Sequence, residues 1–156
     1  MYFGVSSMFG IRRTKKDIKS EGSIKKNPPK EMLLATLCIF SRKGKDEVSL
    51  SELQESIAEY QKEFPKLGYT YSNNFLYSLE VLNDLKELDY NSYIRRHHYK
   101  HDSFLPKRFL SLTKLGKGRG SKILEKLSES EMQYLVGAVG KAIENHEHRW
   151  RLWARH

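Results

Sequence analysis

Positively charged residues gather in residues 93–122, a stretch that holds 9 basic residues and 1 acidic residue. A cation that meets a phosphate releases the counterions condensed there, so a few such contacts give substantial, salt-sensitive affinity for a polyanion. This pattern therefore predicts phosphate binding, and the side chains predicted to carry it are Arg95, Arg96, Lys100, Lys107 and Arg108.

The net charge of +9 is unevenly distributed along the whole chain. Residues 1–44 carry +7, residues 45–92 carry −6, and residues 123–156 have no net charge. We read residues 1–28 as a basic N-terminal arm. Such segregation is typical of a polyanion-binding surface and favours nucleic acid as the partner.

A group of polar side chains precedes the basic stretch, at the predicted start of a helix. Ser72 is the predicted N-cap, and the inward positions are Phe75, Leu79, Leu82 and Leu85. Asparagine can pair with adenine through two hydrogen bonds, and the first amides of a helix favour phosphate. The groups predicted to face outward toward DNA are Ser72, Asn73, Asn74, Tyr77 and Ser78.

Two observations limit this interpretation. The alternative role for Asn73 and Asn74 is to support the helix cap. The helix also carries Glu80, Asp84 and Glu87, which phosphate repels, so only its first turn and a half is expected near DNA.

Residues for catalysis do not form a recognisable constellation. The sequence contains no His-Glu-x-x-His pair, paired cysteines, nucleophile elbow or Asp-rich metal loop, so we expect no enzyme activity and no cofactor. The histidines of residues 97–101 are expected to be solvated rather than metal ligands. Gly116, Gly118 and Gly120 lack the spacing of a phosphate loop, and we expect a flexible junction there.

Hydrophobic periodicity predicts the elements that position these groups. A helix of about a dozen residues should open at Asn27-Pro28-Pro29, and a short strand should cover residues 48–50. The next helix should begin with a capping box, either Ser49 with Glu52 or Ser51 with Gln54. Residues 93–100 and 108–112 then predict an antiparallel hairpin. The inward positions of the first two helices are predicted as Met32, Leu33, Leu37 and Phe40, then Leu50, Leu53, Ile57, Tyr60 and Phe64.

The order of helix, strand, basic loop, strand and a Leu-Thr-x-x-Gly entry into another helix over residues 75–127 resembles the winged helix-turn-helix domains of the MarR and PadR type. The resemblance implies an α+β, mostly helical fold over residues 29–127, in which the helix enters DNA and the hairpin forms the wing. It implies a sequence-specific double-stranded DNA-binding protein that regulates transcription. The alternatives are a non-specific chromatin, replication or partition protein, and a winged helix that binds another protein.

The C-terminal segment, residues 128–156, predicts a long helix capped by Ser128. Its apolar positions alternate in steps of four and three, which is typical of a coiled-coil seam. Packing on its own domain is the alternative, but we favour a homodimerisation helix. The predicted interface residues are Met132, Val136, Val139, Ile143, Trp150 and Trp153.

A single cysteine, Cys38, lies in an apolar helix and cannot form an internal disulfide. No apolar run reaches the roughly 18 residues that a membrane span requires. We therefore expect a folded cytoplasmic protein with no membrane association, in which Cys38 is an inert core residue.

Overall fold

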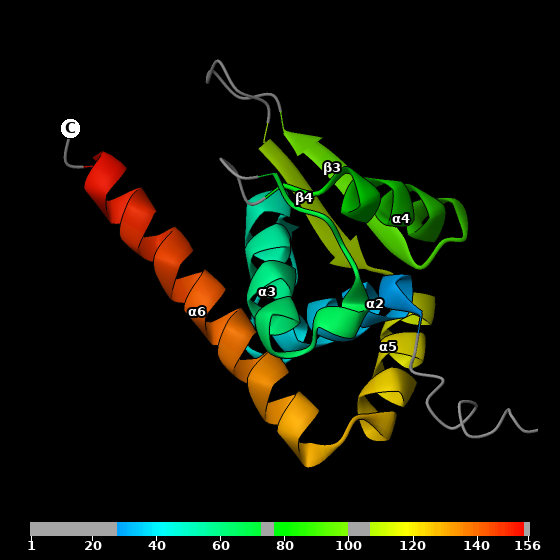
Figure 1. Cartoon of the computed structure of the whole chain (residues 1–156). Coiled ribbons are helices and arrows are strands. Elements are labelled where there is room, and N and C mark those ends of the chain that lie inside the picture. The colour runs from blue at the N-terminus through cyan, green and yellow to red at the C-terminus, as the bar shows by residue number, and fades with distance from the viewer. Residues whose placement is uncertain (1–27, 73–76, 100–106, 155–156) are drawn as a thin grey trace, which may run out of the picture.

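The computed structural model describes residues 28–72, 77–99 and 107–154. The chain is α+β and mostly helical, with one small antiparallel sheet (Figure 1). This architecture is compatible with the predicted winged helix. In chain order the elements are α2 (Pro29–Arg42), β2 (Val48–Ser49), α3 (Leu50–Glu63), the 3-10 helix η1 (Pro65–Leu67), α4 (Leu79–Tyr90), β3 (Ile94–Tyr99), β4 (Lys107–Leu112), α5 (Lys114–Lys126) and α6 (Glu129–Ala154).

Helix α2 is the central element of the fold. Nine consecutive residues, Met32 to Phe40, are buried, so the helix is enclosed on all sides rather than on one stripe. It contacts α3, α4, α5, α6 and β4. The predicted inward positions of α2 are confirmed, and its predicted opening at Pro28-Pro29 is confirmed as well, because Pro29 is the first helical residue.

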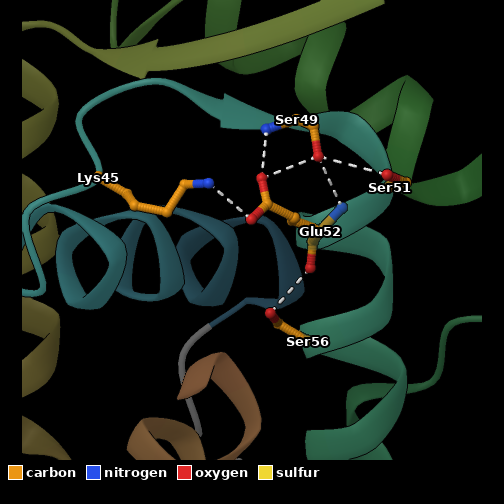
Figure 2. A network of polar contacts seen from close by, with 5 residues as sticks. All are labelled: Lys45, Ser49, Ser51, Glu52 and Ser56. Carbon is orange, nitrogen blue, oxygen red and sulfur yellow. Dashed lines mark hydrogen bonds and ion pairs between the residues drawn. The ribbon is translucent and has the colours of Figure 1, made fainter. Parts of the chain in front are cut away.

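The start of α3 is fixed by a buried polar network around Glu52 (Figure 2). The Ser49 hydroxyl accepts the Glu52 N–H at 3.1 Å, and Glu52 Oε1 accepts the Ser49 N–H at 3.1 Å, which confirms the first of the two predicted capping boxes. Glu52 Oε2 pairs with Lys45 Nζ at 2.8 Å, although the Glu52 side chain is only 1% exposed. One carboxylate thus joins the β2 strand, the α3 N-terminus and the preceding loop.

The three strands form a sheet in the order β2-β4-β3, which confirms the predicted hairpin. Val48 pairs with Leu110, and Ile94 pairs with Leu112. Since side chains alternate between faces, Val48, Ile94 and Leu110 all enter the core, where each is almost fully buried.

Helix α5 contains all three glycines that were predicted to form a flexible junction, so that prediction is wrong. Thr113 caps the helix by accepting the Gly116 N–H at 3.0 Å. A Cβ at Gly116 would overlap the carbonyl oxygen of Tyr93, and one at Gly120 would overlap Cys38 Sγ. These two glycines let α5 lie close to its neighbours, whereas Gly118 faces open space.

We expect Gly116→Ala to destabilise the protein by about 3 kcal/mol, because the obstructing atom is backbone and cannot rotate away. Gly118→Ala is the matched control in the same helix. It should raise the stability by up to about 1 kcal/mol through helix propensity alone. Urea denaturation followed by circular dichroism measures both, and equal stabilities for the two variants contradict the close approach of α5 to Tyr93.

Helix α6 lies along α3, on the side of the molecule away from α4 (Figure 1). Ser128 caps it as predicted, since its hydroxyl accepts the Glu131 N–H at 3.1 Å. Val139 is 0% exposed within its own chain, so its predicted place in a dimer interface is wrong. A heptad spacing of apolar residues is compatible both with packing against α3 and with packing against a second copy of the chain.

The other predicted interface residues divide into two groups. Met132, Val136 and Ile143 are half-buried against the core of their own chain. The side chains of Trp150 and Trp153 lie outside the described residues. The homodimer therefore stays a prediction, without support from the first half of α6.

Candidate nucleic-acid interface

Helix α4 begins later than predicted, at Leu79, and its N-cap is Ser78 rather than Ser72. The Ser78 hydroxyl accepts the Val81 N–H at 3.4 Å. Gln54 of α3 holds the Ser78 backbone from both sides, because its Oε1 accepts the Ser78 N–H and its Nε2 donates to the Ser78 carbonyl. Ser78 is 0% exposed, so the prediction that it faces outward toward DNA is wrong.

The other residues predicted around this helix start lie as follows. Ser72 is exposed, and its N–H donates to the Tyr77 carbonyl at 3.3 Å. Asn73 and Asn74 lie outside the described residues. Tyr77 is 44% exposed, in line with its predicted outward direction. Leu79, which was predicted to face inward, is 64% exposed, so the inward prediction is wrong for Leu79, whereas it is confirmed for Leu85 and Leu82, which are buried and half-buried against the core.

The inward face of α4 consists of Val81, Leu85 and Leu88. The residues on the opposite side are spaced four, three and four apart along the helix, which places them in one line on its solvent face. All of them are exposed: Leu79, Asn83, Lys86 and Tyr90. We call this line of four residues the α4 outer stripe. Sequence reasoning missed it because the helix was given the wrong start, although its spacing follows once Val81, Leu85 and Leu88 are known to be inward.

The acidic residues of α4 lie beside this stripe and contact neighbouring segments. Glu80 Oε1 accepts the Thr70 N–H, and Asp84 Oδ2 accepts the Tyr69 hydroxyl at 2.6 Å. Burial raises the pKa of Tyr69, and the hydrogen bond to Asp84 raises it further, so the phenol stays a proton donor.

The two acids nearer the C-terminus of α4 form ion pairs with cations. Glu87 pairs with Lys30 of α2 at 3.1 Å, and Asp89 pairs with Arg96 of β3 at 2.9 Å. Every acidic side chain of α4 is thus directed toward another part of the chain, and the α4 outer stripe carries a single charge, that of Lys86.

The predicted hairpin cations are in different situations. Arg95 and Arg108 are exposed on the hairpin and have no ion-pair partner among the described residues. Arg96 is held by Asp89 through both Nε and Nη2, which fixes the hairpin to the end of α4. Lys107 belongs to β4, but its side chain lies outside the description, as does the whole of Lys100.

A hollow of about 220 Å³ lies between α3 and α6 and is lined by Glu55, Glu59, Lys62 and Lys141 together with alanines and Asn145. Lys62 and Lys141 both pair with Glu59, and Arg149 pairs with Glu55 Oε2 at 3.3 Å, whereas Glu55 Oε1 is buried with no hydrogen-bond partner among the described residues. Within the described ranges no group of three or more His, Cys, Asp or Glu side chains could hold a metal ion.

Comparison with known protein families and with curated proteins finds no match to this chain. In the part of the chain that the structure describes, no helix is both long enough and apolar enough to cross a bilayer.

Proposed function

We propose that this protein binds double-stranded DNA in a sequence-specific manner, as a winged-helix regulator of transcription. In this proposal the α4 outer stripe enters the major groove, and the β3–β4 hairpin lies against the backbone. The order α4, β3, β4, α5 supports it, because this is the order of helix, strand, strand and helix on which the resemblance seen in the sequence rests.

The composition of the α4 outer stripe is the observation that carries the proposal. Asn83 presents an amide that can bond both N6 and N7 of adenine, and Lys86 presents an ammonium suited to guanine or to phosphate. The acids of the helix are held to the side by Thr70, Tyr69, Lys30 and Arg96, so the repulsion expected from the sequence is reduced where the groove would lie.

Selection of bound sequences from a random duplex pool tests the proposal directly. Asn83→Ala should reduce the preference for the selected site over random DNA by about ten- to a hundred-fold, the effect of losing one bidentate base contact. Gln133→Ala, an exposed amide on α6, is the control and should leave the preference unchanged. Recovery of no preferred sequence, with duplex binding retained, would replace the proposal by non-specific DNA binding.

A second candidate function is binding to another protein through the same face. Leu79 and Tyr90 are 64% and 88% exposed, and large apolar groups on one helical line are typical of a helix that docks in a hydrophobic groove. One measurement distinguishes the two candidate functions, DNA binding and protein binding. Absence of duplex binding by the wild-type protein at about 0.1 M salt favours the protein partner, because phosphate contacts give measurable affinity there.

A further inference from the structure

Helix α5 carries a strongly basic solvent face that the proposed α4 interface does not use. The helix contains five basic residues and one acidic residue, Glu125. Arg119 pairs with Glu31 of α2 at 2.7 Å. The remaining four, all exposed, have no ion-pair partner among the described residues: Lys114, Lys117, Lys122 and Lys126.

Spacing places three of these lysines on one line with a glycine. Lys114, Gly118, Lys122 and Lys126 follow one another at intervals of four residues, which lie along one side of a helix. We call these four residues the α5 basic stripe. At a rise of about 1.5 Å per residue the stripe is about 18 Å long, which matches the rise of about five base pairs of duplex.

Gly118 has no structural role that the fold explains. Gly116 and Gly120 are required by close neighbours, whereas a Cβ at Gly118 would meet nothing within 4 Å. A glycine inside a helix weakens it without such a requirement. Its position between Lys114 and Lys122 leaves the helix surface open to the close approach of a partner.

The charge at the N-terminus of α5 opposes helix stability, whereas that of Lys126 in the last turn favours it. The first turn contains Lys114 and no acidic residue, so a positive charge lies at the positive end of the helix dipole. An anionic partner at this end would relieve the repulsion. The only large apolar residue exposed on α5 is Leu115, which is too little apolar surface for a helix that inserts into a membrane.

The position of α5 relates this face to the proposed DNA interface. The Thr113 hydroxyl, at the α5 N-terminus, donates to the Ser92 carbonyl at 2.6 Å in the turn that directly follows α4. Lys114 therefore lies just beyond the end of α4 that carries Tyr90. We infer that the α5 basic stripe is a second contact surface for the duplex backbone, an inference that rests on the proposed DNA binding. This contact would extend the DNA footprint of the protein by about five base pairs beyond the site that α4 reads.

The test replaces Lys114, Lys122 and Lys126 together with Gln and measures binding to labelled duplexes of about 12 and 25 base pairs over a range of salt. We expect the slope of log affinity against log salt on the long duplex to fall by up to about three. The gain in affinity from the short to the long duplex should be lost. The control variant replaces Lys62, Lys66 and Lys141 with Gln, on the α3 and α6 side of the molecule. It lowers the net charge by the same amount and should change neither the salt slope nor the gain in affinity with duplex length.

Gly118→Ala gives a second readout that does not depend on charge. It should stabilise the helix and yet weaken binding to the long duplex several-fold, because a methyl group then stands where the backbone approaches. Gly137→Ala, at an open position of α6, should stabilise without changing binding.

The outcomes separate this inference from the proposed function. Equal salt slopes for the two triple variants on the long duplex overturn the α5 surface while leaving the α4 proposal intact. A reduced slope in the α5 variant, with full site preference in Asn83→Ala, supports α5 and overturns base reading by α4. Absence of duplex binding by the wild-type protein, or binding of the α5 stripe to anionic lipid vesicles alone, overturns the inference.

Discussion

Val139→Glu is expected to unfold most of the protein at room temperature. Val139 is 0% exposed on α6, a helix that packs against α3 and α2, and its neighbours Ala138 and Ala142 are buried as well. None of the described Lys or Arg side chains is buried in the core, so a carboxylate placed there has no described cation to pair with. We expect a loss of about 5 kcal/mol or more, because the buried carboxylate is uncompensated and larger than the valine it replaces, and this loss equals the whole free energy of unfolding of a marginally stable domain. Circular dichroism and thermal denaturation measure it.

The matched control is Gly137→Glu, two residues earlier on the same helix. Gly137 is exposed and a Cβ there meets nothing within 4 Å, so the variant should remain as stable as the wild type. A folded, monomeric Val139→Glu protein is the result that the seam reading of the sequence predicts. That result, together with a dimeric wild type in light scattering, would show that α6 leaves α3 and packs against another chain.

Glu52→Ala should cost about 3 kcal/mol of stability, as much as Gly116→Ala. The substitution removes the acceptor for the Ser49 N–H and for the Lys45 ammonium, and it opens space at a residue whose side chain is 1% exposed (Figure 2). A buried hydrogen-bond donor that loses its partner destabilises the folded state by the full free energy of its lost hydration. The broken buried ion pair with Lys45 destabilises the folded state further.

Ser51→Ala is the control for Glu52→Ala in the same turn. Among the described residues, its exposed hydroxyl bonds to the Ser49 hydroxyl alone, at 3.3 Å, so its loss should change the urea midpoint very little. If Glu52→Ala and Ser51→Ala unfold at the same urea concentration, the network around Glu52 does not hold the start of α3.

Local periodicity predicted α2, α3 and the hairpin because in each the residues that face the core recur at the period of the element. The capping box at Ser49 was predictable for the same reason, since both partners lie within one turn. The alternative capping box, Ser51 with Gln54, does not form, because the Gln54 side chain bonds instead to the backbone of Ser78. The amide of Gln54 thus acts over 24 residues of sequence, which no local pattern reveals.

The start of α4 was mispredicted for this reason. Ser72 and Ser78 are equally good N-cap residues by type, and a stripe through Leu79, Leu82 and Leu85 fits a helix that begins at either. Only the contact with Gln54 selects Ser78. Once the start moves, Leu79 turns from a core position to the solvent face, and the candidate site moves from the residues after Ser72 to the α4 outer stripe.

The glycines of α5 and the seam of α6 show a second limit of sequence reasoning. The sequence cannot distinguish a glycine that close packing requires from a glycine in a flexible junction. Only the positions of Tyr93 beside Gly116 and of Cys38 beside Gly120 show that these two glycines are required for packing. Likewise, the spacing of Val136, Val139 and Ile143 predicts one apolar face on the helix. It does not indicate whether the element that packs against this face belongs to the same chain or to a second copy.

The turn between α4 and β3 determines how the proposed interface meets its partner. Ser92 has a φ of 66° in this turn, and the Tyr93 N–H donates to the Leu88 carbonyl at 2.9 Å. Thr113 bonds to the carbonyls of Ser92 and Tyr93, and Arg96 bonds to Asp89. Helix α4, the described hairpin strands and the first turn of α5 are therefore preorganised as one body, so association orders little additional backbone and the conformational entropy lost on binding is small.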